Sequence, residues 1–522
     1  MKEFLEDLLN IIKKISSAEN PQEVERDEST ANHMRQEYSL LSESERQQMM
    51  EVIYDLAGND KKLYLYMLSI VVSFVKDVRI LKEIYNELLH CDFDVIYSMN
   101  LCWQSNRFIF TNNIENSDSL FELKKEIYEK NIRNIRVHIK NRDYIPYGER
   151  QKRVVLVIAP LLNKGHAPSV KLDNMAYWLG KLGYDIMVVS LNSHYIQISH
   201  SDDWWKAKIC NTLSRQTILF ELDFNLTKLK GYYVMFDDDN YFDMTNNIIG
   251  KIYEYNPEFV MMIGDYCPVA DLCSDFTTVI TMACKKNNPI TIAPIIARYF
   301  EYSKEEEQIY KSHLGEGQVI VDVKSLDIVK EGIEKYTKEQ FGNDEKDFLV
   351  CIAGNRLDIE VSTEMINILN GILKDNKEVK IVFIGDCPKL KSVLQKNIYK
   401  ERYDFWGYQR NFKAAIGACD LFLNPPRQGG GLGAYYACEQ QVPVITLPHC
   451  DCSNVGESFI CNSIDEMPEL VHRYIHDNEF MDKQKAQCRI KTQEWQSRDN
   501  LREIQNMCDF VKEYALKIED EK

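Results

Sequence analysis

The sequence from Asn424 to Thr446 reads NPPRQGGGLGAYYACEQQVPVIT, and three consecutive glycines, Gly429–Gly431, stand inside it. They separate an apolar stretch at 420–425, which predicts a strand, from a helical pattern at 432–440. In open α/β sheets, ligands bind beyond the carboxyl ends of strands, where glycine lets the backbone approach them. Free amides and the positive end of the helix then face one point, so the segment predicts a diphosphate site. The alternative is a flexible turn.

The glycine segment belongs to a longer series of apolar strands separated by segments of helix length. Strands that alternate with helices predict parallel sheets covered on both faces. The sequence therefore predicts an α/β protein with two successive Rossmann-like units, at 150–342 and 345–495. Strands are expected at 153–160, 185–192, 259–264, 277–282, 290–295 and 318–323 in the first unit, and at 348–354, 379–385, 420–425 and 443–448 in the second.

Both ends of the chain have helical patterns instead. Residues 1–145 predict a mainly helical region, and Leu5, Leu8, Leu9 and Ile12 lie on one expected helix face. Asp60 is expected to cap a helix that begins at the next residue. The stretch 496–522 predicts one long amphipathic helix.

Composition limits the classes of function. The chain has 522 residues, enough for two or three domains, and 80 acidic against 63 basic residues give a net charge of −17. An acidic surface repels phosphate backbones, which disfavours nucleic acid as a partner. No apolar run reaches the roughly 20 residues that span a bilayer, and no secretory signal begins the chain. Together with 15 cysteines that stand mostly in apolar runs, this predicts a soluble, cytoplasmic protein.

Two clusters could bind metal, and each has a more ordinary interpretation. Asp237–Asp239 resembles a metal-binding acidic motif, although such acids more often solvate a loop. His449–Cys452, with Cys461 further on, lacks the paired spacing of a zinc site. No metal site is therefore predicted. The pair Trp204–Trp205 suits stacking on sugars or packing at a domain edge, and packing is favoured.

Several motifs resemble those of GT-B glycosyltransferases, especially family 4 and related bacterial enzymes. Alignment on Val442–Ile445 places Gly429 and Gly431 on glycines of that family. Some bacterial relatives share the Asn424–Arg427 pattern (N-P-x-R) and a later G-E-x-F. The resemblance covers about 150–495 and implies a GT-B architecture of two Rossmann-like domains facing a cleft. The other matching motifs are Gly456–Phe459 (G-E-x-F) and His166–Pro168 (H-A-P, in the first loop of the first unit).

The resemblance also assigns candidate residues. Gly354, Asn355 and Arg356 close the first strand of the second unit, where these enzymes commonly bind the donor phosphate. Arg356 and Arg427 could equally be ordinary surface arginines, and His166 an ordinary loop histidine. The predicted catalytic residues are His166, Arg356 and Gln428. The predicted donor-binding residues are Gly354, Asn355, Arg427, Gly429, Gly430, Gly431, Leu432, Tyr436, Glu439 and Glu457. The predicted acceptor-side residues are Gly165 and Asp265. Asp265 could instead cap the next helix.

The sequence departs from family 4 at two positions. Gln428 and Tyr436 stand where that family has glutamates, and Glu439, three residues on along the same helix face, could replace the second. Either the donor is held differently or catalysis is lost.

Two functions follow from these expectations. The first is transfer of a hexose from a nucleotide sugar, UDP-linked, to a glycan or protein acceptor without metal or other cofactor. The second is a non-catalytic GT-B subunit that stabilises an active partner. A dinucleotide-dependent dehydrogenase ranks third because no G-x-G-x-x-G follows either first strand. The helical region is expected to bind the acceptor or a protein partner, or to self-associate, so a chain starting near Gly148 should still bind nucleotide.

Overall fold

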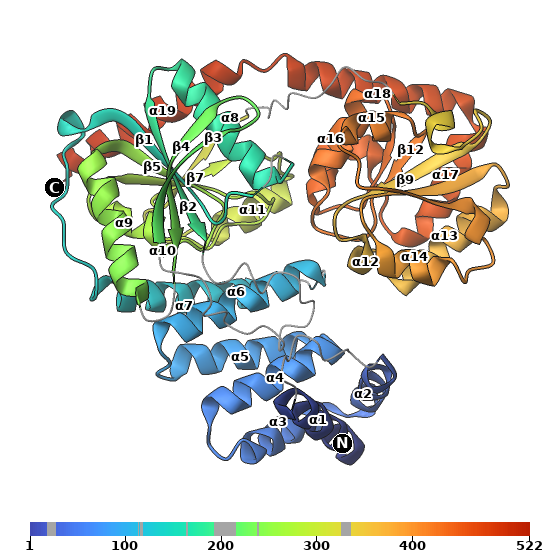
Figure 1. Cartoon of the computed structure of the whole chain (residues 1–522), viewed down its shortest axis with the longest axis horizontal. Helices are drawn as coiled ribbons and strands as arrows, with labels where there is room; N and C mark the ends of the chain where they lie inside the picture. The colour runs from blue at the N-terminus through green and yellow to red at the C-terminus, as the bar shows by residue number, and fades with distance from the viewer. Residues whose placement is uncertain are drawn as a thin grey trace.

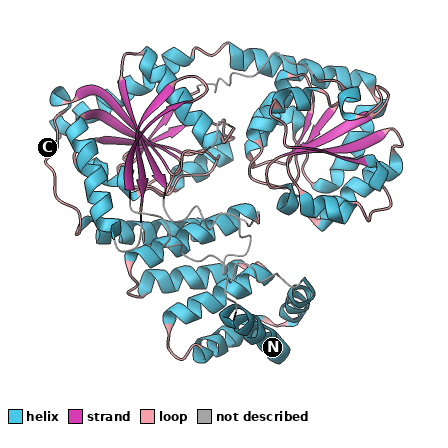
Figure 2. Ribbon diagram, viewed as in Figure 1, coloured by secondary structure: helices cyan, strands magenta, loops and turns pink. Residues whose placement is uncertain are grey.

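The computed structural model describes residues 1–17, 28–112, 114, 118–162, 165–192, 216–236, 240–324 and 336–521. A helical region forms the base of the molecule, and two α/β domains lie side by side above it (Figure 1). Each domain has a central sheet with helices on both faces (Figure 2). The predicted Asp237–Asp239 and Trp204–Trp205 features lie outside the described residues.

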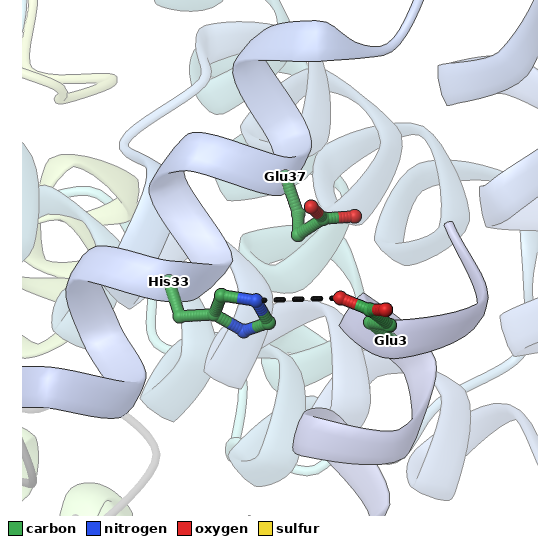
Figure 3. Close-up of side chains that lie close together, drawn as sticks. All are labelled: Glu3, His33 and Glu37. Atoms are coloured by element: carbon green, nitrogen blue, oxygen red, sulfur yellow. Dashed lines mark ion pairs between the residues drawn. The ribbon is translucent and has the colours of Figure 1, made fainter.

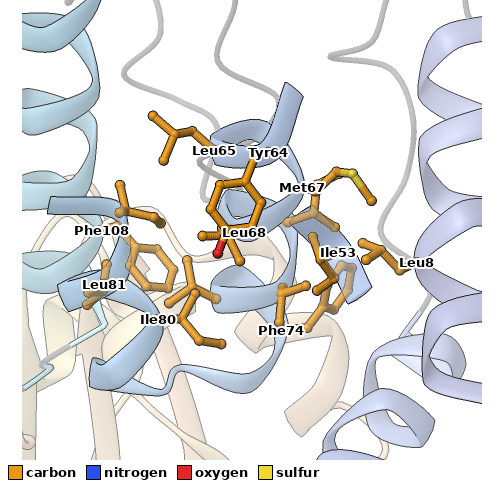
Figure 4. Close-up of a cluster of buried hydrophobic side chains, with 14 of the residues drawn as sticks. Leu8, Ile53, Tyr64, Leu65, Met67, Leu68, Phe74, Ile80, Leu81 and Phe108 are labelled. Atoms are coloured by element: carbon orange, nitrogen blue, oxygen red, sulfur yellow. The ribbon is translucent and has the colours of Figure 1, made fainter. Parts of the chain in front are cut away.

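The helical region has its own apolar core, built mainly from α1 to α6 (Figure 4). Helix α4 lies at its centre, with nearly every side chain from Tyr64 to Phe74 buried. The predicted cap is confirmed, because the Asp60 carboxylate accepts from the amides of Lys62 and Leu63 at 2.9 and 3.1 Å. The helices are α1 (Lys2–Ser17), α2 (Glu28–Leu40), α3 (Glu43–Leu56), α4 (Lys61–Val75), α5 (Val78–His90), α6 (Val95–Thr111) and α7 (Asp118–Arg136).

The first α/β domain contains an eight-stranded sheet in the order β3-β4-β2-β1-β5-β6-β7-β8, parallel except for β3 at the edge. Its strands are β1 (Gln151–Ile158), β2 (Asp185–Asn192), β3 (Gln216–Asp223), β4 (Lys228–Met235), β5 (Pro257–Ile263), β6 (Thr278–Met282), β7 (Ile295–Arg298) and β8 (Val319–Asp322). Alternate residues of β1 point into different cores. One core includes α8 (Ala167–Lys181) and α19 (Asn500–Asp520), and the other includes α9 (Tyr241–Tyr255).

The second core of this domain also contains side chains of α6 and α7, among them Met99, Phe121 and Tyr128. The Tyr128 hydroxyl donates to the buried Asp271 carboxylate at 2.5 Å, and Phe121 stacks on His313 with ring centroids 4.2 Å apart. The last two helices of the helical region are therefore part of the first α/β domain's core.

The second α/β domain has a fully parallel sheet of five strands in the order β11-β10-β9-β12-β13. Its strands are β9 (Phe348–Ala353), β10 (Val379–Ile384), β11 (Tyr403–Gly407), β12 (Leu421–Leu423) and β13 (Val444–Ile445). The helices around it are α12 (Leu357–Glu360), α13 (Thr363–Asp375), α14 (Pro388–Leu394), α15 (Phe412–Gly417), α16 (Gly431–Glu439), α17 (Met467–His476) and α18 (Asn478–Gln496).

Most of the expected strands are present, and the exceptions have local causes. The segment 290–294 is not a strand, because its backbone makes other contacts: the Ile292 amide donates to Asp271 at 3.2 Å, and the Ile290 carbonyl accepts from Tyr266 at 2.9 Å. Strand β7 begins only after Pro294, which has no amide to give to a ladder. The sequence pattern does not predict β3, β4 or β11.

The chain ends by crossing between the domains. Helix α18 buries Cys488 and Trp495 in the second domain, and α19 then returns to the first (Figure 1). None of the described helices is long and apolar enough to cross a membrane.

Candidate functional site

Each sheet has one place where neighbouring strands lead away in opposite directions, and ligands bind at such places in open α/β folds. In the second domain this place lies between β9 and β12. The loop after β9 contains Gly354–Arg356, and the loop after β12 contains Asn424–Gly430. The structure therefore brings the two predicted donor-binding segments together.

Gly430 fixes the geometry of the glycine loop. It is the N-cap of α16 and has a φ of +96°, a left-handed conformation that side chains disfavour. A Cβ there would lie 2.7 Å from Arg427 Nη2 and 2.8 Å from Asn424 Oδ1. Since Gly430 has no side chain, no N-cap side chain accepts from the first amides of the helix, which point out of its start.

Arg427 is buried beneath this loop, with only 7% of its surface exposed. Its guanidinium donates from Nε to Asn424 Oδ1 at 2.7 Å, from Nη1 to Glu360 Oε2 at 2.6 Å and from Nη2 to the Ala353 carbonyl at 2.8 Å. These contacts fasten the loop after β12 to the end of β9. Its proposed contact with the donor stays a prediction, and the contacts shown are within the protein.

Arg356 is the more accessible of the two arginines, with 35% of its side chain exposed. Its Nε and Nη2 donate to Glu360 Oε1 at 3.0 and 2.8 Å, and Nη2 lies 3.4 Å from the place a Cβ would take on Gly429. Burial raises the pKa of Glu360, but the charges of Arg427 and Arg356 outweigh it and hold the pKa below its ordinary value. Two arginines and one carboxylate leave one net positive charge beside the glycines.

The remaining donor-side candidates differ in burial and in their contacts. Tyr436 is only 4% exposed and packs edge-on against Phe412, with ring centroids 6.1 Å apart. Glu439 ends α16, about 12 Å along the helix axis from its start, and pairs with Lys413 at 2.8 Å. A ribose contact by Glu439 stays a prediction and requires this ion pair to open. Asn355 and Glu457 are exposed, whereas Gln428 and Leu432 are half-buried.

The acceptor-side candidates lie at the corresponding place of the first sheet, between β1 and β5. His166 is the N-cap of α8, with Nδ1 3.2 Å from the Ser169 hydroxyl, and Gly165 beside it is exposed. Burial lowers the pKa of His166. Asp265 pairs with Lys285 at 3.0 Å. The capping interpretation of Asp265 is wrong, because the next helix, α10 (Pro268–Leu272), has Cys267 as its N-cap.

The segment His449–Cys452, at which no metal site is predicted, does not bring its side chains to one point. His449 lies 3.3 Å from Glu306 of the first domain, Cys450 Sγ lies 3.3 Å from Thr446 Oγ1, and Cys452 Sγ donates to the Gly429 carbonyl at 3.7 Å. Within the described ranges, the group of such residues close enough to share an ion is Glu3, His33 and Glu37.

That group lies in the helical region, where Glu3 and His33 are exposed and Glu37 is half-buried. Figure 3 shows the three side chains close together. His33 Nε2 is 3.5 Å from Glu3, and its Nδ1 is 2.8 Å from Asp7, so the imidazole joins α2 to α1. The hydrogen bond to Asp7 raises the pKa of His33. These ion pairs account for the positions of Glu3 and His33 without an ion.

Two residues of the site, Glu360 and Asn424, have roles that sequence reasoning missed. Glu360 stands four residues after Arg356, a spacing that predicts an ion pair on one helix face. Its second partner, Arg427, is 67 positions away in the sequence, and no local pattern connects the two. Asn424 stands in the sequence only as part of a motif, whereas in the structure its side-chain oxygen accepts from Arg427.

No protein-family model matches the sequence, and no curated protein matches it either. Among solved structures, an O-GlcNAc transferase mutant from Thermobaculum terrenum matches with a TM-score of 0.54 at 10% identity, over 99% of each chain. HepE from Anabaena, in complex with UDP, matches with a TM-score of 0.48 at 11% identity, over 69% of this chain and 100% of its own. A glycosyltransferase from Rickettsia africae matches with a TM-score of 0.49 at 11% identity, over 70% of this chain and 99% of its own.

The match to the Thermobaculum protein includes the helical region as well as both α/β domains, since it covers nearly the whole of each chain. At this identity the likeness shows the fold and not the chemistry. The likeness to family 4 in particular stays a prediction. The two sheets, their strand order and this match together establish that the chain has the GT-B fold, preceded by a helical region.

Proposed function

We propose that this protein is a glycosyltransferase that moves a hexose from a UDP-linked donor to a hydroxyl group of a glycan or protein. The observation that carries the proposal is the position of Arg356, whose Nη2 lies 3.4 Å from the Cβ position of Gly429 at the start of α16. Helix-start amides and a guanidinium that meet at a strand-order switch suit a diphosphate. The GT-B fold, found also in an O-GlcNAc transferase, accords with sugar transfer.

In the proposed reaction, the protein stabilises the departing nucleoside diphosphate. Negative charge grows on the diphosphate as the sugar leaves, and preorganised donors aimed at that charge lower the barrier. The amides of Gly430 and Gly431 and the Arg356 guanidinium are those donors. Arg427, already hydrogen-bonded within the protein, adds its charge and holds the loop in shape.

His166 acts from the other domain in this proposal. A lowered pKa keeps its imidazole neutral near pH 7, so it can accept a proton from the acceptor hydroxyl. If Nδ1 donates to Ser169, Nε2 remains as the proton acceptor. The fixed positive charges of the donor site take the part that Mg²⁺ plays elsewhere, so EDTA should leave transfer unchanged.

The test is calorimetric binding of UDP and of a panel of UDP-hexoses to the full chain, followed by hydrolysis assays on each sugar that binds. We expect micromolar to millimolar binding of UDP and slow hydrolysis of one UDP-hexose. Gly430→Val should abolish binding in a folded protein. Wild-type protein that binds neither UDP nor any UDP-hexose would overturn the proposal.

A second candidate, a non-catalytic subunit, is favoured by one observation. Tyr436, which occupies the place of a family 4 glutamate, is 4% exposed and packs in the core, and Gln428 replaces the other glutamate. This candidate predicts donor binding without hydrolysis or transfer by the isolated chain. It also predicts that activity appears when a catalytic partner is added.

A further inference from the structure

Helix α6 of the helical region reaches the donor site of the second α/β domain. In Figure 1 it runs beneath the first domain toward the second. Phe110 lies in its last turn, and the centre of its ring is 4.4 Å from Cζ of Arg356. Its Cζ also lies 3.9 Å from the place that a Cβ would take on Gly429. The ring therefore covers both the arginine and the first glycine of the loop.

The Arg356 guanidinium is consequently held from two sides. Glu360 Oε1 accepts from Nε and Nη2 along one edge, and the Phe110 ring lies against the group. Among the described residues, Nη1 has no protein acceptor. An aromatic face attracts a guanidinium, and the planar fork of arginine loses little freedom once its plane is fixed. The contacts fix the guanidinium with Nη2 beside Gly429 and, within the described ranges, leave Nη1 without a protein acceptor.

The helix itself is well anchored at this end. Phe108 and Ile109 are each 4% exposed, and both belong to the core of the helical region. Phe110, by contrast, is only half-buried and faces the second domain. A fixed helix end thus presents one aromatic side chain to a charged loop of another domain.

We infer that Phe110 is a positioning residue for the donor: it holds Arg356 over Gly429, so that the helical region completes the nucleotide-sugar site. The inference rests on the proposed function, because it assigns Arg356 to the diphosphate. It gives the helical region a part in donor binding, beyond the acceptor or partner role expected from sequence.

The test is a double-mutant cycle on the full chain, with UDP as the ligand and calorimetry as the readout. Phe110→Leu keeps apolar bulk but removes the π face, and it should weaken UDP binding by about two- to tenfold. Phe110→Tyr keeps the face and should bind nearly as wild type does. In an Arg356→Met background, Phe110→Leu should cause no further loss. Equal losses in both backgrounds, or no loss in either, would overturn the inference.

Phe108→Leu is the matched control, because it makes the same change two residues earlier on the same helix. Phe108→Leu should lower the melting temperature and leave UDP affinity unchanged. Phe110→Leu should weaken UDP binding and leave the melting temperature nearly unchanged. Wild-type protein that binds no UDP overturns the proposed function and this inference together. If wild type binds UDP but the effects of the Phe110 and Arg356 substitutions simply add, the inference is overturned and the proposed function stands.

The contact can also be followed without nucleotide. Phenylglyoxal modifies exposed guanidinium groups, and peptide mass spectrometry gives the rate at Arg356. Phe110→Leu should raise that rate, while Phe108→Leu should not. An unchanged rate in Phe110→Leu would show that the ring does not cover Arg356 in solution.

Discussion

Gly430 is subject to two separate constraints, a left-handed backbone and a lack of space. The two can be distinguished, because other glycines of this chain have one constraint or neither. Gly317 has a φ of +74° with nothing within 4 Å of the place a Cβ would take, and Gly371 has open space and an ordinary backbone. The clash at Gly430 involves Arg427 and Asn424, which hold the loop.

We therefore predict that Gly430→Ala weakens UDP binding at least tenfold, a loss of roughly 1.4 kcal/mol or more, as measured by calorimetry. Backbone strain alone should cost about 1–2 kcal/mol of stability, which Gly317→Ala should show without any effect on binding. Gly371→Ala, within helix α13, should be neutral or slightly stabilising. Normal UDP binding by a folded Gly430→Ala protein would contradict the role assigned to the loop.

The proposed base at His166 leads to a prediction about pH. Burial lowers its pKa below the ordinary 6.5, so the wild-type rate should fall only on the acid side of 6.5. His166→Gln should reduce the rate by about 10²–10⁴-fold and remove that acid limb from the pH profile of kcat. A variant that keeps the limb would assign it to another group.

The same shift affects stability with a definite sign. Since the folded-state pKa lies below the unfolded one, the unfolded chain binds more protons in the window below 6.5, and stability falls as the pH drops through it. The melting temperature of His166→Gln should therefore rise relative to that of wild type as the solution is acidified.

At this scale the sequence predicts which segments meet at the candidate site, but not how their side chains contact one another. Gly429–Gly431, Arg356 and His166 can be placed because each follows a recognisable strand, and strand ends meet at one edge of a parallel sheet. The ion pair between Glu360 and Arg427 cannot be predicted in this way, because it depends on how two loops approach each other in space. The position of Phe110 is equally hidden, since nothing in its own helix indicates a partner in another domain.

At the scale of elements, the helical region is less independent than its sequence indicates. The sequence predicts that a chain starting near Gly148 keeps nucleotide binding. The structure leads to a different expectation, because that chain lacks Met99, Phe121 and Tyr128 from the core of the first sheet and loses Phe110 from the second domain's loop.

From the structure we predict that the truncated chain aggregates or melts well below wild type. Exposed apolar side chains of the sheet would face solvent, at about 25 cal/mol for each Å² uncovered. Circular dichroism and size-exclusion chromatography would check this. A truncation at about residue 93, which keeps α6 and α7, should retain more stability. Equal stability of both truncations would contradict the shared core.

Element prediction succeeds for the central strands that are buried on both faces, and it misses β3 and β4 at one end of the first sheet. Strands β1, β2 and β5 each contain an uninterrupted apolar run, as central parallel strands do. Edge strand β3 contains exposed apolar residues, such as Leu219 at 72%, and it begins and ends with polar ones. Its pairing with β4 is antiparallel, which the alternation of strands and helices does not predict.

At the scale of the whole molecule, the two α/β domains contact each other next to the glycine loop. The Lys286 amide of the first domain donates to Asp451 of the second at 3.2 Å. Glu301 of the first domain accepts from Lys491 at 3.2 Å and from Arg498 at 2.9 Å, and its amide donates to Asn454 at 3.0 Å. Asp451 also packs against Gly431, so this interface borders the proposed donor site.

The Asp451 carboxyl gives this interface a pH dependence. Burial raises its pKa from 3.8 to about 7. The folded state therefore holds the proton more tightly than the unfolded state, and the group's contribution to stability is complete at low pH and is lost as the pH rises from 3.8 to about 7.

We predict that Asp451→Asn, which keeps an acceptor for the Lys286 amide, is more stable than wild type at pH 8 by no more than about 4 kcal/mol. The difference should shrink steadily toward pH 4. Melting temperatures of both proteins across this range would measure it. A difference that is constant with pH would show that Asp451 titrates normally.

The return of α19 to the first domain also has a consequence for how the protein is made. Ile504, Met507 and Val511 complete one face of a sheet whose strands all lie before residue 325. During synthesis the ribosome must finish the entire second domain before these side chains exist. The first domain of the nascent chain therefore keeps an exposed apolar face until α19 has been translated. Growing chains in this condition bind chaperones or misassemble. In a chain that stops shortly before residue 500, that apolar face would stay exposed, although every residue of the proposed donor loop would be present.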